Sequence, residues 1–440
     1  MAYIFQREKG RGGFARVDIV SDETGALFAR KMYDPHPHLV AAVGHEHLKH
    51  RFIREVRYQS QISHPNVVRI IEHFLQSDPP AFIMPVAECT LKEELERDPT
   101  LGQNLQTALF DILSGLEHIH SLDIIHRDLK PANILKFFTH DGHAYYAISD
   151  FGLMSATNSD SSTLTGTNAN GGTENYAAPE LIGSFRKATP SADIYAFGAI
   201  LHDIFGNGST RIPYTKLTLP GPIGKIIEKC TERVAFRRYS NVSVLRDELY
   251  QALTAAPVSF NSSGEETIVE LLRTGRELSN DEWDSVFVQI ERNSAKNQSN
   301  INILRALSID HVNYLKTEAP ELFAAMGSFF AEHMANESFD FDYCDVLASK
   351  AQSFYDGGGL ALQADIALAL LELGTSHNRW YVERKAASML GRDIPRALAE
   401  RILMEINVQQ VSFKSKIAHM ERSIGFNKAT LHPLLLAYVA

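Results

Sequence analysis

Short apolar runs of strand length, together with one amphipathic segment, fill the first ninety residues of the chain. Residues 3–7, 15–20 and 25–32 predict three strands, with a cluster of glycines between the first two. Residues 46–62 place Phe52, Ile53 and Val56 on one face, which predicts a helix. Further apolar runs at 67–75 and 81–86 predict two more strands. This part of the chain therefore predicts a small sheet packed beside one helix.

Helical periodicity dominates the rest of the sequence. Residues 91 to about 253 are mainly helical in pattern, except for a Ser/Thr/Asn/Gly-rich segment at 155–175, and a loop this long is usually functional or disordered. Residues 254–267 are rich in Pro, Ser, Gly and Asn, which predicts a linker. Residues 268–440 predict about eight helices, with breaks near 336–342, 356–359, 376–378 and 391–395. Helices of this length with short connections form either a bundle or a short solenoid.

Composition narrows the class of protein. The 440 residues include 43 basic and 53 acidic side chains, a net charge of −10, which argues against nucleic-acid binding. Three scattered cysteines suit a reducing compartment, and no apolar run reaches the length of a membrane span, so we expect a soluble cytoplasmic protein. Residues 1–257 carry 26 basic and 29 acidic side chains, and residues 258–440 carry 17 and 24. The acidic C-terminal part therefore predicts a basic protein partner.

The glycine cluster is the first candidate for chemistry. Gly10, Gly12 and Gly13 precede Ala15, and glycines let a backbone approach phosphate oxygens closely. A glycine-rich hairpin turn explains the same residues equally well. Lys31 ends the third predicted strand, and a lysine buried there needs an anion, either a nucleotide phosphate or a helix glutamate.

Three motifs farther along the chain decide between these readings. Residues 126–133 read His-Arg-Asp-Leu-Lys-Pro-Ala-Asn, residues 150–152 read Asp-Phe-Gly, and residues 178–180 read Ala-Pro-Glu. Their order and spacing resemble the eukaryotic-type (Hanks-type) serine/threonine protein kinases over residues 1 to about 255.

The resemblance implies an α+β protein kinase fold of two lobes, followed by an all-α domain. We expect a kinase domain over 1–257, with an N-lobe over 1–86 and a C-lobe over 91–257. A linker at 258–267 and a helical domain at 268–440 follow, the latter with a regulatory or partner-binding role. Because the glycine cluster begins at residue 10, regulation is expected from this helical part, from the loop at 155–175 or from a partner.

The resemblance also implies catalytic and metal-binding roles. Asp128 would accept the proton of the substrate hydroxyl, and Lys130 would neutralise charge on the transferring phosphoryl group. Asn133 and Asp150 would hold Mg²⁺, with Mn²⁺ as an alternative, through the oxygen ligands that such ions prefer. Lys31 would bridge the α- and β-phosphates of ATP. Its helix partner would be Glu55, because the rival Glu46 lies too early in the helix.

ATP would lie between the glycine loop and a hinge at residues 83–87. The residues that the resemblance implies for this contact are Gly10, Gly12, Gly13, Val17, Ala29, Lys31, Met84, Pro85 and Ala87. Pro85 is unusual directly after Met84, the gatekeeper position. The family uses only the carbonyl of that residue, which proline keeps, and takes an N–H from the position of Ala87.

Structural and regulatory roles come from the same resemblance. Asp193 would hold the backbone of the His-Arg-Asp loop, and Glu180 would pair with Arg238. Arg127 would receive a phosphate on the activation loop, the segment at 155–173. The candidate phosphorylation sites are Thr163, Thr165, Thr167 and Thr173, the last of which would also contact the catalytic aspartate and lysine. The alternative is a polar loop that carries no modification.

One residue departs from the family pattern, and two further features allow more than one interpretation. Gln59 stands four residues after Glu55, where an apolar residue is usual, so the helix is expected to pack loosely until something orders it. Five histidines between 36 and 50 allow a metal site, but a solvated loop over 34–44 is favoured. The acidic run at 93–98 is either an exposed helix face or the border of a peptide groove that favours basic substrates.

The sequence thus predicts an ATP-dependent serine/threonine protein kinase that acts on proteins, including itself. Lys130 follows the serine/threonine rather than the tyrosine pattern of the family. The alternatives are a nucleotide-gated scaffold whose helical domain is the effector, and a phosphotransferase for small molecules.

Overall fold

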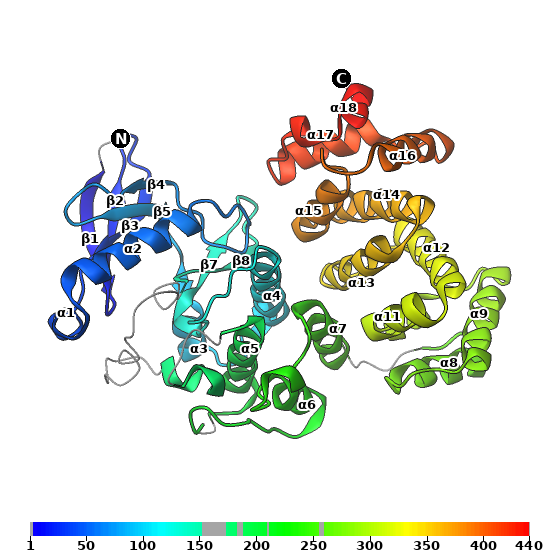
Figure 1. The fold of residues 1–440 in the computed structure, drawn as a ribbon, viewed down its shortest axis with the longest axis horizontal. Helices are drawn as coiled ribbons and strands as arrows, with labels where there is room; N and C mark the ends of the chain where they lie inside the picture. Colours follow the sequence, from blue (N-terminus) through cyan, green and yellow to red (C-terminus); the bar gives the residue numbers. More distant parts are fainter. Residues whose placement is uncertain (1–2, 152–172, 183–187, 209–210, 255–258, 440) are drawn as a thin grey trace. The chain divides into compact units, whose positions relative to one another are not determined.

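The chain divides into two compact units. The computed structural model describes residues 3–151, 173–182, 188–208, 211–254 and 259–439 (Figure 1). The first unit runs from Met1 to Leu245 and the second from Arg246 to Ala440. The border falls inside helix α7 (Val242–Leu253), before the predicted border at 257/258.

A five-stranded antiparallel sheet forms the N-terminal lobe of the first unit. Its strand order is β1-β2-β3-β5-β4, with bounds β1 (Ile4–Arg11), β2 (Ala15–Ser21), β3 (Leu27–Tyr33), β4 (Glu72–Phe74) and β5 (Ala81–Pro85). Helix α2 (His45–Gln59) buries Leu48, Phe52 and Val56, which share one face at a spacing of four residues. These side chains join one apolar cluster with Phe82 of β5. The helix is therefore held against the sheet by its apolar stripe.

Two predictions for this lobe were wrong. Residues 34–44 were expected to be a loop, but they contain helix α1 (Pro37–Val43), which starts with a proline at its first position and buries Leu39. The predicted strand at 67–75 is reduced to β4. Val67 forms a bridge with Ile148, and the Val68 N–H donates to the Ile148 carbonyl, so this part of the segment pairs with the other lobe instead.

The second lobe is helical around a small sheet. The sheet has the order β6-β7-β8, and its two longer strands follow the His-Arg-Asp loop, where the sequence predicted mainly helix. The bounds of these elements are α3 (Leu91–Arg97), α4 (Leu105–Ser121), α5 (Pro190–Phe205), α6 (Gly221–Cys230), β6 (Cys89–Thr90), β7 (Ile134–Phe138) and β8 (Ala144–Ile148). Helices α4 and α5 are buried along most of their length. The two-lobed α+β fold and the all-α second unit confirm the predicted fold class.

The second unit is built from α-helices. Its helices within the described residues are α8 (Ser263–Arg273), α9 (Asn280–Ala295), α10 (Ile301–Ala306), α11 (Ile309–Glu318), α12 (Pro320–Asn336), α13 (Tyr343–Gly357), α14 (Leu360–His377), α15 (Trp380–Met389), α16 (Arg396–Val408), α17 (Phe413–Ser423) and α18 (Pro433–Val439). These are more than the eight or so expected, in part because α10 and α18 are too short to show a helical period. Each of the four predicted breaks falls at a border between two helices, although 356–357 still belongs to α13 and 376–377 to α14.

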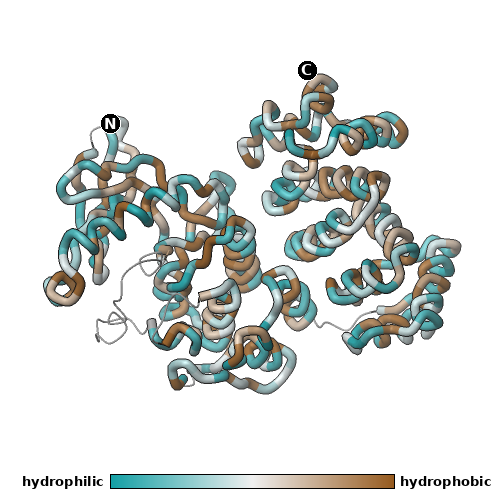
Figure 2. The backbone as a smooth tube through the Cα atoms, in the orientation of Figure 1, coloured by the Kyte–Doolittle hydropathy of each residue, from teal (hydrophilic) through white to brown (hydrophobic). Residues whose placement is uncertain are grey.

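The arrangement of these helices follows their order in the chain (Figure 1). The most extensive packing joins near neighbours, such as α11 with α12 and α13, or α14 with α12, α13, α15 and α16. Figure 2 shows apolar positions along α14, the central helix of the unit, which agrees with its ten buried residues. This local packing is typical of a short solenoid rather than a closed bundle.

The predicted linker at 258–267 is shorter in the structure. Helix α8 begins at Ser263, because the side chain of Ser262 accepts a hydrogen bond from the Glu265 N–H and caps the helix. A capping box begins helix α9, where Ser279 and Glu282 exchange hydrogen bonds.

Buried charges tie the last turns of α7 into the second unit. The Lys350 ammonium lies 3.1 Å from the Asp247 carboxylate, and both side chains are almost completely buried. One residue earlier, Arg246 donates to the hydroxyls of Ser349 and Tyr381, both at 2.7 Å. The C-terminal half of α7 therefore packs with α13 and α15.

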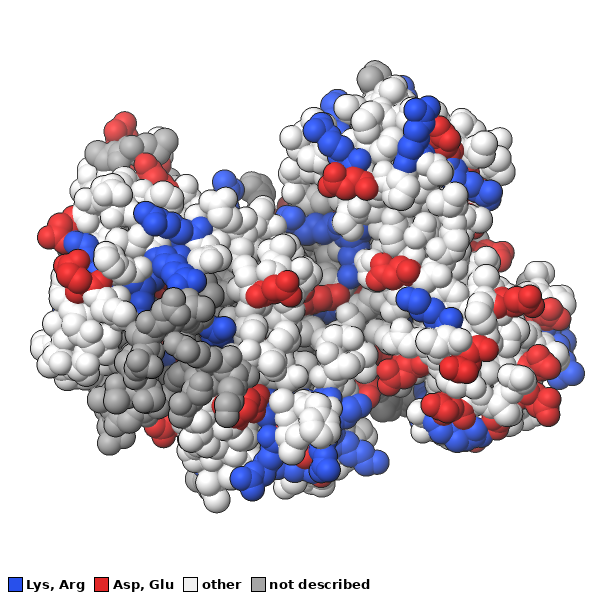
Figure 3. All heavy atoms as spheres, in the orientation of Figure 1, with Lys and Arg blue, Asp and Glu red and all other residues white. Residues whose placement is uncertain are grey.

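The surface charges differ between regions of the chain (Figure 3). Lysine and arginine side chains gather over α6 in this view. In the second unit, residues 258–340 carry 14 acidic and 6 basic side chains, so the acidity of the C-terminal part is concentrated there. Among the described residues, none of the helices has the length and apolar character needed to cross a membrane.

Candidate active site

Three residues of the predicted catalytic loop converge between α4 and β7. The Lys130 Nζ donates to both carboxylate oxygens of Asp128, at 3.0 and 2.8 Å. The Asn133 side-chain amide donates to the Asp128 backbone carbonyl at 2.9 Å and to its carboxylate at 3.0 Å. The turn of 3₁₀ helix η2 (Pro131–Asn133) brings Asn133 back to Asp128. Two donors thus fix the orientation of one carboxylate.

A buried aspartate on α5 holds the backbone of this loop. Asp193 accepts hydrogen bonds from the N–H groups of His126 and Arg127, both at 2.8 Å, and pairs with His120 at the same distance. Burial by itself raises the pKa of Asp193, but these partners bring it below its ordinary value. Arg127 has a φ of +66°, an uncommon conformation outside glycine, and the carboxylate stabilises it.

Lys31 on β3 forms an ion pair with Asp150, not with Glu55. Lys31 and Asp150 are in direct contact, and Asp150 has a φ of +58°. Within the described residues no ion pair joins Lys31 to Glu55, so the predicted β3–helix pair is absent from this conformation. The charge of Glu55 still acts on Lys31 at longer range.

The electrostatics of these three groups follow from burial and from that pairing. Burial, with smaller contributions from Asp150 and Asp128, raises the pKa of Glu55 to about 8, although the charge of Lys31 opposes the shift. Burial alone lowers the pKa of Lys31, but Asp150 and Glu55 raise it above its ordinary value. The pKa of Asp150 stays below its ordinary value, because Lys31 outweighs the opposite effect of burial. The site therefore holds one stable ion pair and one carboxyl that is largely neutral at pH 7.

Side chains of the predicted hinge and of β3 belong to one apolar cluster. In the ladder between β3 and β5, Ala29 pairs with Met84, so both lie at the same level of the sheet. Val17, Ala87 and Leu135 belong to the same apolar cluster as this pair. Leu135 was missed in the sequence, although its position in an apolar run two residues after Asn133 was a usable signal.

The glycine cluster is the hairpin between β1 and β2. Gly10 pairs with Val17, and the Gly12 N–H donates to the Ala15 carbonyl at 2.8 Å, which closes a tight turn. A side chain at Gly10 would meet no atom within 4 Å, so its backbone is open on that side. The tip of the hairpin is fastened to the start of α1, where the His36 N–H donates to the Gly13 carbonyl at 2.9 Å.

The predicted structural pair also lies in the second lobe. Arg238 binds Glu180 through two parallel hydrogen bonds of 2.7 Å, and it also donates to the Ser191 carbonyl at 2.9 Å. The Arg238 side chain has no exposed surface. Such a bidentate, buried pair fixes the segment after the activation loop to the helical core.

The candidate phosphorylation sites are placed only in part. Thr163, Thr165 and Thr167 lie outside the described residues, and Thr173 begins the 3₁₀ turn η4 (Thr173–Asn175). Arg127 is the candidate phosphate partner, and its buried Nε and Nη1 have no hydrogen-bond partner in the described parts of the chain. Burial, and also the nearby charge of Arg54, lowers the pKa of Arg127.

Gln59 is packed tightly, which corrects the expectation of a loose helix. Its side-chain amide donates to the Val68 carbonyl at 2.8 Å, and only 2% of its surface is exposed. Two carboxylates of the acidic run after the hinge are engaged in contacts within the fold. Glu94 is buried against Lys136 and Tyr146, and Glu93 caps α3. Neither carboxylate is free to line a groove for basic peptides.

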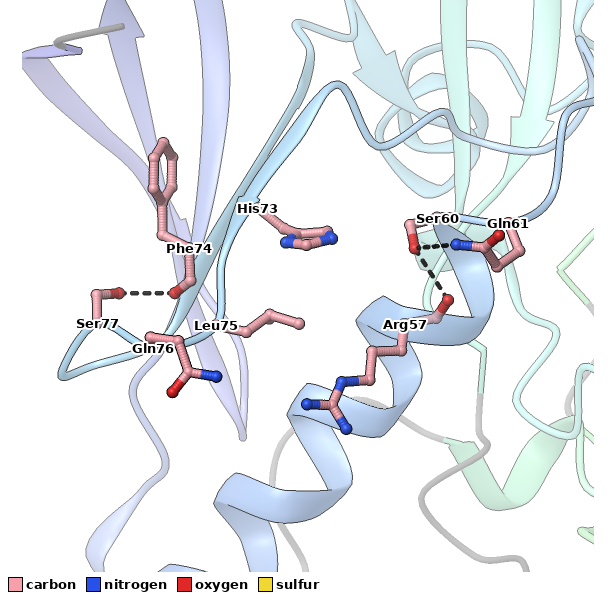
Figure 4. A pocket seen from close by; sticks show the side chains of 8 residues that line it. All are labelled: Arg57, Ser60, Gln61, His73, Phe74, Leu75, Gln76 and Ser77. Carbon is pink, nitrogen blue, oxygen red and sulfur yellow. Dashed lines mark hydrogen bonds between the residues drawn. The ribbon is translucent and has the colours of Figure 1, made fainter.

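A separate groove of about 620 Å³ lies at the back of the N-terminal lobe (Figure 4). It runs between the end of α2 and the connection from β4 to β5, and its lining residues are Arg57, Ser60, Gln61, His73, Phe74, Leu75, Gln76 and Ser77. None of them belongs to the candidate active site. Within the described residues no three His, Cys, Asp or Glu side chains are grouped to hold a metal, the histidines at 36–50 included.

Comparison with known proteins assigns this arrangement to a family. Residues 3–219 match the family model of the protein kinase domain. This part of the chain is a Hanks-type serine/threonine protein kinase domain. No match to a family model extends into the second unit.

Several curated kinases resemble the kinase domain. Serine/threonine-protein kinase PrkC of Bacillus subtilis is 30% identical over 226 residues, which cover 47% of this chain and 34% of PrkC. Serine/threonine-protein kinase PkaA of Streptomyces coelicolor is 30% identical over 203 residues, 42% of this chain and 36% of PkaA. The carbon catabolite-derepressing protein kinase of Saccharomyces cerevisiae is 27% identical over 220 residues, 50% of this chain and 32% of that protein. The chain thus spans about a third of the length of these relatives.

Proposed function

We propose that this chain transfers the γ-phosphoryl group of Mg–ATP to serine or threonine hydroxyls of proteins. The observation that carries the proposal is that Lys130 and Asn133 both donate to the Asp128 carboxylate within 3.0 Å, in a domain that also pairs Lys31 with Asp150. An arrangement of one carboxylate, two cations and two oxygen ligands matches what phosphoryl transfer requires, which is positioning and neutralisation of charge.

The residues fit a nucleotide. The apolar cluster that includes Val17, Ala29, Met84 and Leu135 offers the kind of surface that a flat base contacts. Among the described residues the N–H of Ala87 donates to no backbone acceptor, so it is available to the base, and the carbonyl of Pro85 is a second polar contact beside it. The open backbone at Gly10 and the ammonium of Lys31 suit the phosphates.

The residues also fit a divalent cation. Asn133 and Asp150 offer oxygen ligands, and Mg²⁺ is usually held by one or two such side chains together with the nucleotide's phosphates. When bound, the cation neutralises charge on the phosphates, and Mn²⁺ is an alternative of the same chemistry. Asp150 would then leave Lys31, which is free to pair with Glu55 on α2.

Asp128 is the residue we assign to the hydroxyl of the substrate. Its carboxylate accepts hydrogen bonds from Lys130 and Asn133, which hold it in one orientation for the incoming hydroxyl. Asp128 would accept the proton as the oxygen attacks the phosphorus, and Lys130 would stabilise the charge on the transferring group. Asp193 keeps the loop backbone in place during this step.

The substrates we propose include the chain itself. The half-buried Arg127 offers two donor groups, Nε and Nη1, that have no partner among the described residues, and a phosphate on Thr163, Thr165 or Thr167 would satisfy them. Mass spectrometry of the recombinant protein should find phosphate on this loop in the wild type and none in Asp128→Asn. Identical, unphosphorylated loops in both proteins would refute autophosphorylation.

Turnover of ATP with generic protein substrates tests the function. Lys31→Ala and Asp128→Asn should each lower phosphorylation of protein strongly, whereas the control Asp141→Asn, an exposed carboxylate of the β7–β8 turn, should leave it unchanged. Phosphorylation of a small metabolite in place of protein would contradict the proposal. Full activity of Asp128→Asn would contradict the role of that residue.

For the second unit we propose a basic protein partner, bound by the acidic residues between 258 and 340. The excess of 14 acidic over 6 basic side chains supports this choice. Binding of such a partner should weaken steeply with ionic strength, since exposed charges are screened by salt. A cytoplasmic location stays a prediction from the cysteine content, and the three cysteines are free and buried.

A further inference from the structure

Lys9 makes a contact between the glycine hairpin and the hinge. It precedes Gly10 within β1, and its Nζ donates to the Ala87 backbone carbonyl at 3.1 Å. The two residues are 78 positions apart in the sequence. Strand β1 is exposed along its whole length, so no core packing forces this side chain toward the hinge. The hydrogen bond itself therefore connects the glycine hairpin to the hinge.

The Lys9 contact joins two segments that border the apolar cluster of the proposed base site. Gly10, the next residue in β1, pairs with Val17, which packs against this cluster. Ala87 of the hinge belongs to the same cluster. The four-carbon stem of Lys9 therefore connects the hairpin and the hinge on which the proposed base site depends.

A nearby carboxylate also acts on the Lys9 ammonium. Glu93, in the first turn of α3, accepts a hydrogen bond from the Thr90 N–H, which is the main reason why its pKa is lowered, and the charge of Lys9 contributes to the same shift. The negative charge of Glu93 therefore favours an ammonium at this position, where the Ala87 carbonyl accepts its hydrogen bond.

We propose that Lys9 is a latch on the nucleotide site, a positioning residue that bonds the Ala87 carbonyl and thereby slows the exchange of nucleotide. The inference rests on the proposed function, because it assumes that the base of the nucleotide binds at the apolar cluster beside Ala87. A hydrogen bond to a charged donor is stronger than a neutral one, but this one is partly exposed to water. We therefore expect its loss to raise the dissociation rate by about threefold to tenfold.

The test measures dissociation of a fluorescent ADP analogue from the full chain by stopped flow, with no phosphoryl transfer involved. Lys9→Met keeps the stem and removes the donor, and Lys9→Arg keeps a donor. Arg7→Met is the matched control, since it removes a cation from the same exposed strand. The latch predicts faster dissociation for Lys9→Met, a rate near that of the wild type for Lys9→Arg, and no change for Arg7→Met.

The outcomes separate the latch from the function on which it rests. If the wild type binds the analogue and Lys9→Met releases it at the same rate or more slowly, the latch is refuted and the nucleotide site stands. If Lys9→Met and Arg7→Met accelerate dissociation equally, the effect is one of general charge, which also refutes the latch. Failure of the wild type to bind any nucleotide would instead refute the proposed function.

Discussion

The buried pair of Asp247 and Lys350 allows a sharp prediction about stability. Asp247→Ala leaves the Lys350 ammonium in the core of the second unit, where its side chain has no exposed surface. Its remaining contacts are two long ones, both of 3.4 Å, to the backbone carbonyls of Leu304 and Arg305. The variant therefore tests whether the last turns of α7 are an essential part of the second unit.

The size of the effect follows from burial. Removing one partner of a buried ion pair typically costs about 3–5 kcal/mol, because the other charge stays buried without compensation. For a unit of this length, a loss of that size lowers the melting temperature by about 10 °C. Exposed pairs contribute about 0–1 kcal/mol, so Glu400→Ala, which breaks the surface pair with Arg396, should change little.

The stability that Asp247→Ala loses should also depend on pH in a defined direction. Burial already lowers the pKa of Lys350, and Asp247 opposes this shift. Without Asp247 the pKa falls further in the folded state than in the unfolded state, so the unfolded state binds more protons and stability rises with pH. The difference between Asp247→Ala and the wild type should therefore shrink as the pH rises from about 7 toward the ordinary pKa of lysine, about 10.4.

The assay is thermal unfolding of the full chain, followed by circular dichroism and by hydrogen exchange of α13. The double variant Asp247→Leu/Lys350→Met should recover most of the stability, since it removes both charges together. A single Asp247→Ala variant as stable as Glu400→Ala would refute this reasoning.

The Asp247–Lys350 pair also affects what a truncated chain can show. A truncation near residue 258 removes Lys350 but keeps Asp247, and it also removes Ser349 and Tyr381, which Arg246 contacts. We expect such a fragment to lose stability in α7, so a change in its kinase activity would not report regulation alone.

Three further predictions concern the kinase domain. Burial holds the pKa of Glu55 at about 8, and in the proposed exchange of partners Lys31 leaves Asp150 and pairs with Glu55 when Mg–ATP binds. Binding should therefore release a proton from Glu55 at pH 7, which calorimetry in two buffers of different ionisation enthalpy detects. An equal proton release in Glu55→Gln would contradict this exchange of partners. Arg238→Ala should destabilise the first unit by about 3–5 kcal/mol in thermal unfolding. Arg238→Lys should restore only part of this stability, because lysine lacks the bidentate geometry of arginine. Full recovery of the stability by lysine would contradict the role of the bidentate pair. Gln59→Leu should cost about 1–2 kcal/mol, because the Val68 carbonyl loses its donor; a higher melting temperature would show that an apolar residue fits better there.

The fold could be predicted where the pattern repeats over several turns or where a motif fixes the family. The apolar stripe of Phe52 and Val56 located α2, and the motifs at 126–133 and 150–152 implied the two lobes. Helix α1 was missed because its seven residues are too few to show a period, and its start depends on Pro37. Strands β7 and β8 form a local hairpin, but they were missed because each has only five residues within a region of mainly helical pattern.

The site shows the same division between local and distant information. The contacts of Asp128 with Lys130 and Asn133 arise within one short loop, so the sequence carries them. The partner of Lys31 is decided by residues far apart in the chain, and in this conformation Asp150 takes the place of Glu55. The amide of Gln59 likewise finds a carbonyl nine residues away that only the folded chain presents.

The most direct test of the central claim is transfer of labelled phosphate from ATP to a serine-containing protein substrate by the full chain. We expect the wild type to incorporate phosphate on serine or threonine in the presence of Mg²⁺. We expect Asp128→Asn to lose that incorporation and to retain nucleotide binding. Undiminished incorporation by Asp128→Asn would contradict the proposed function.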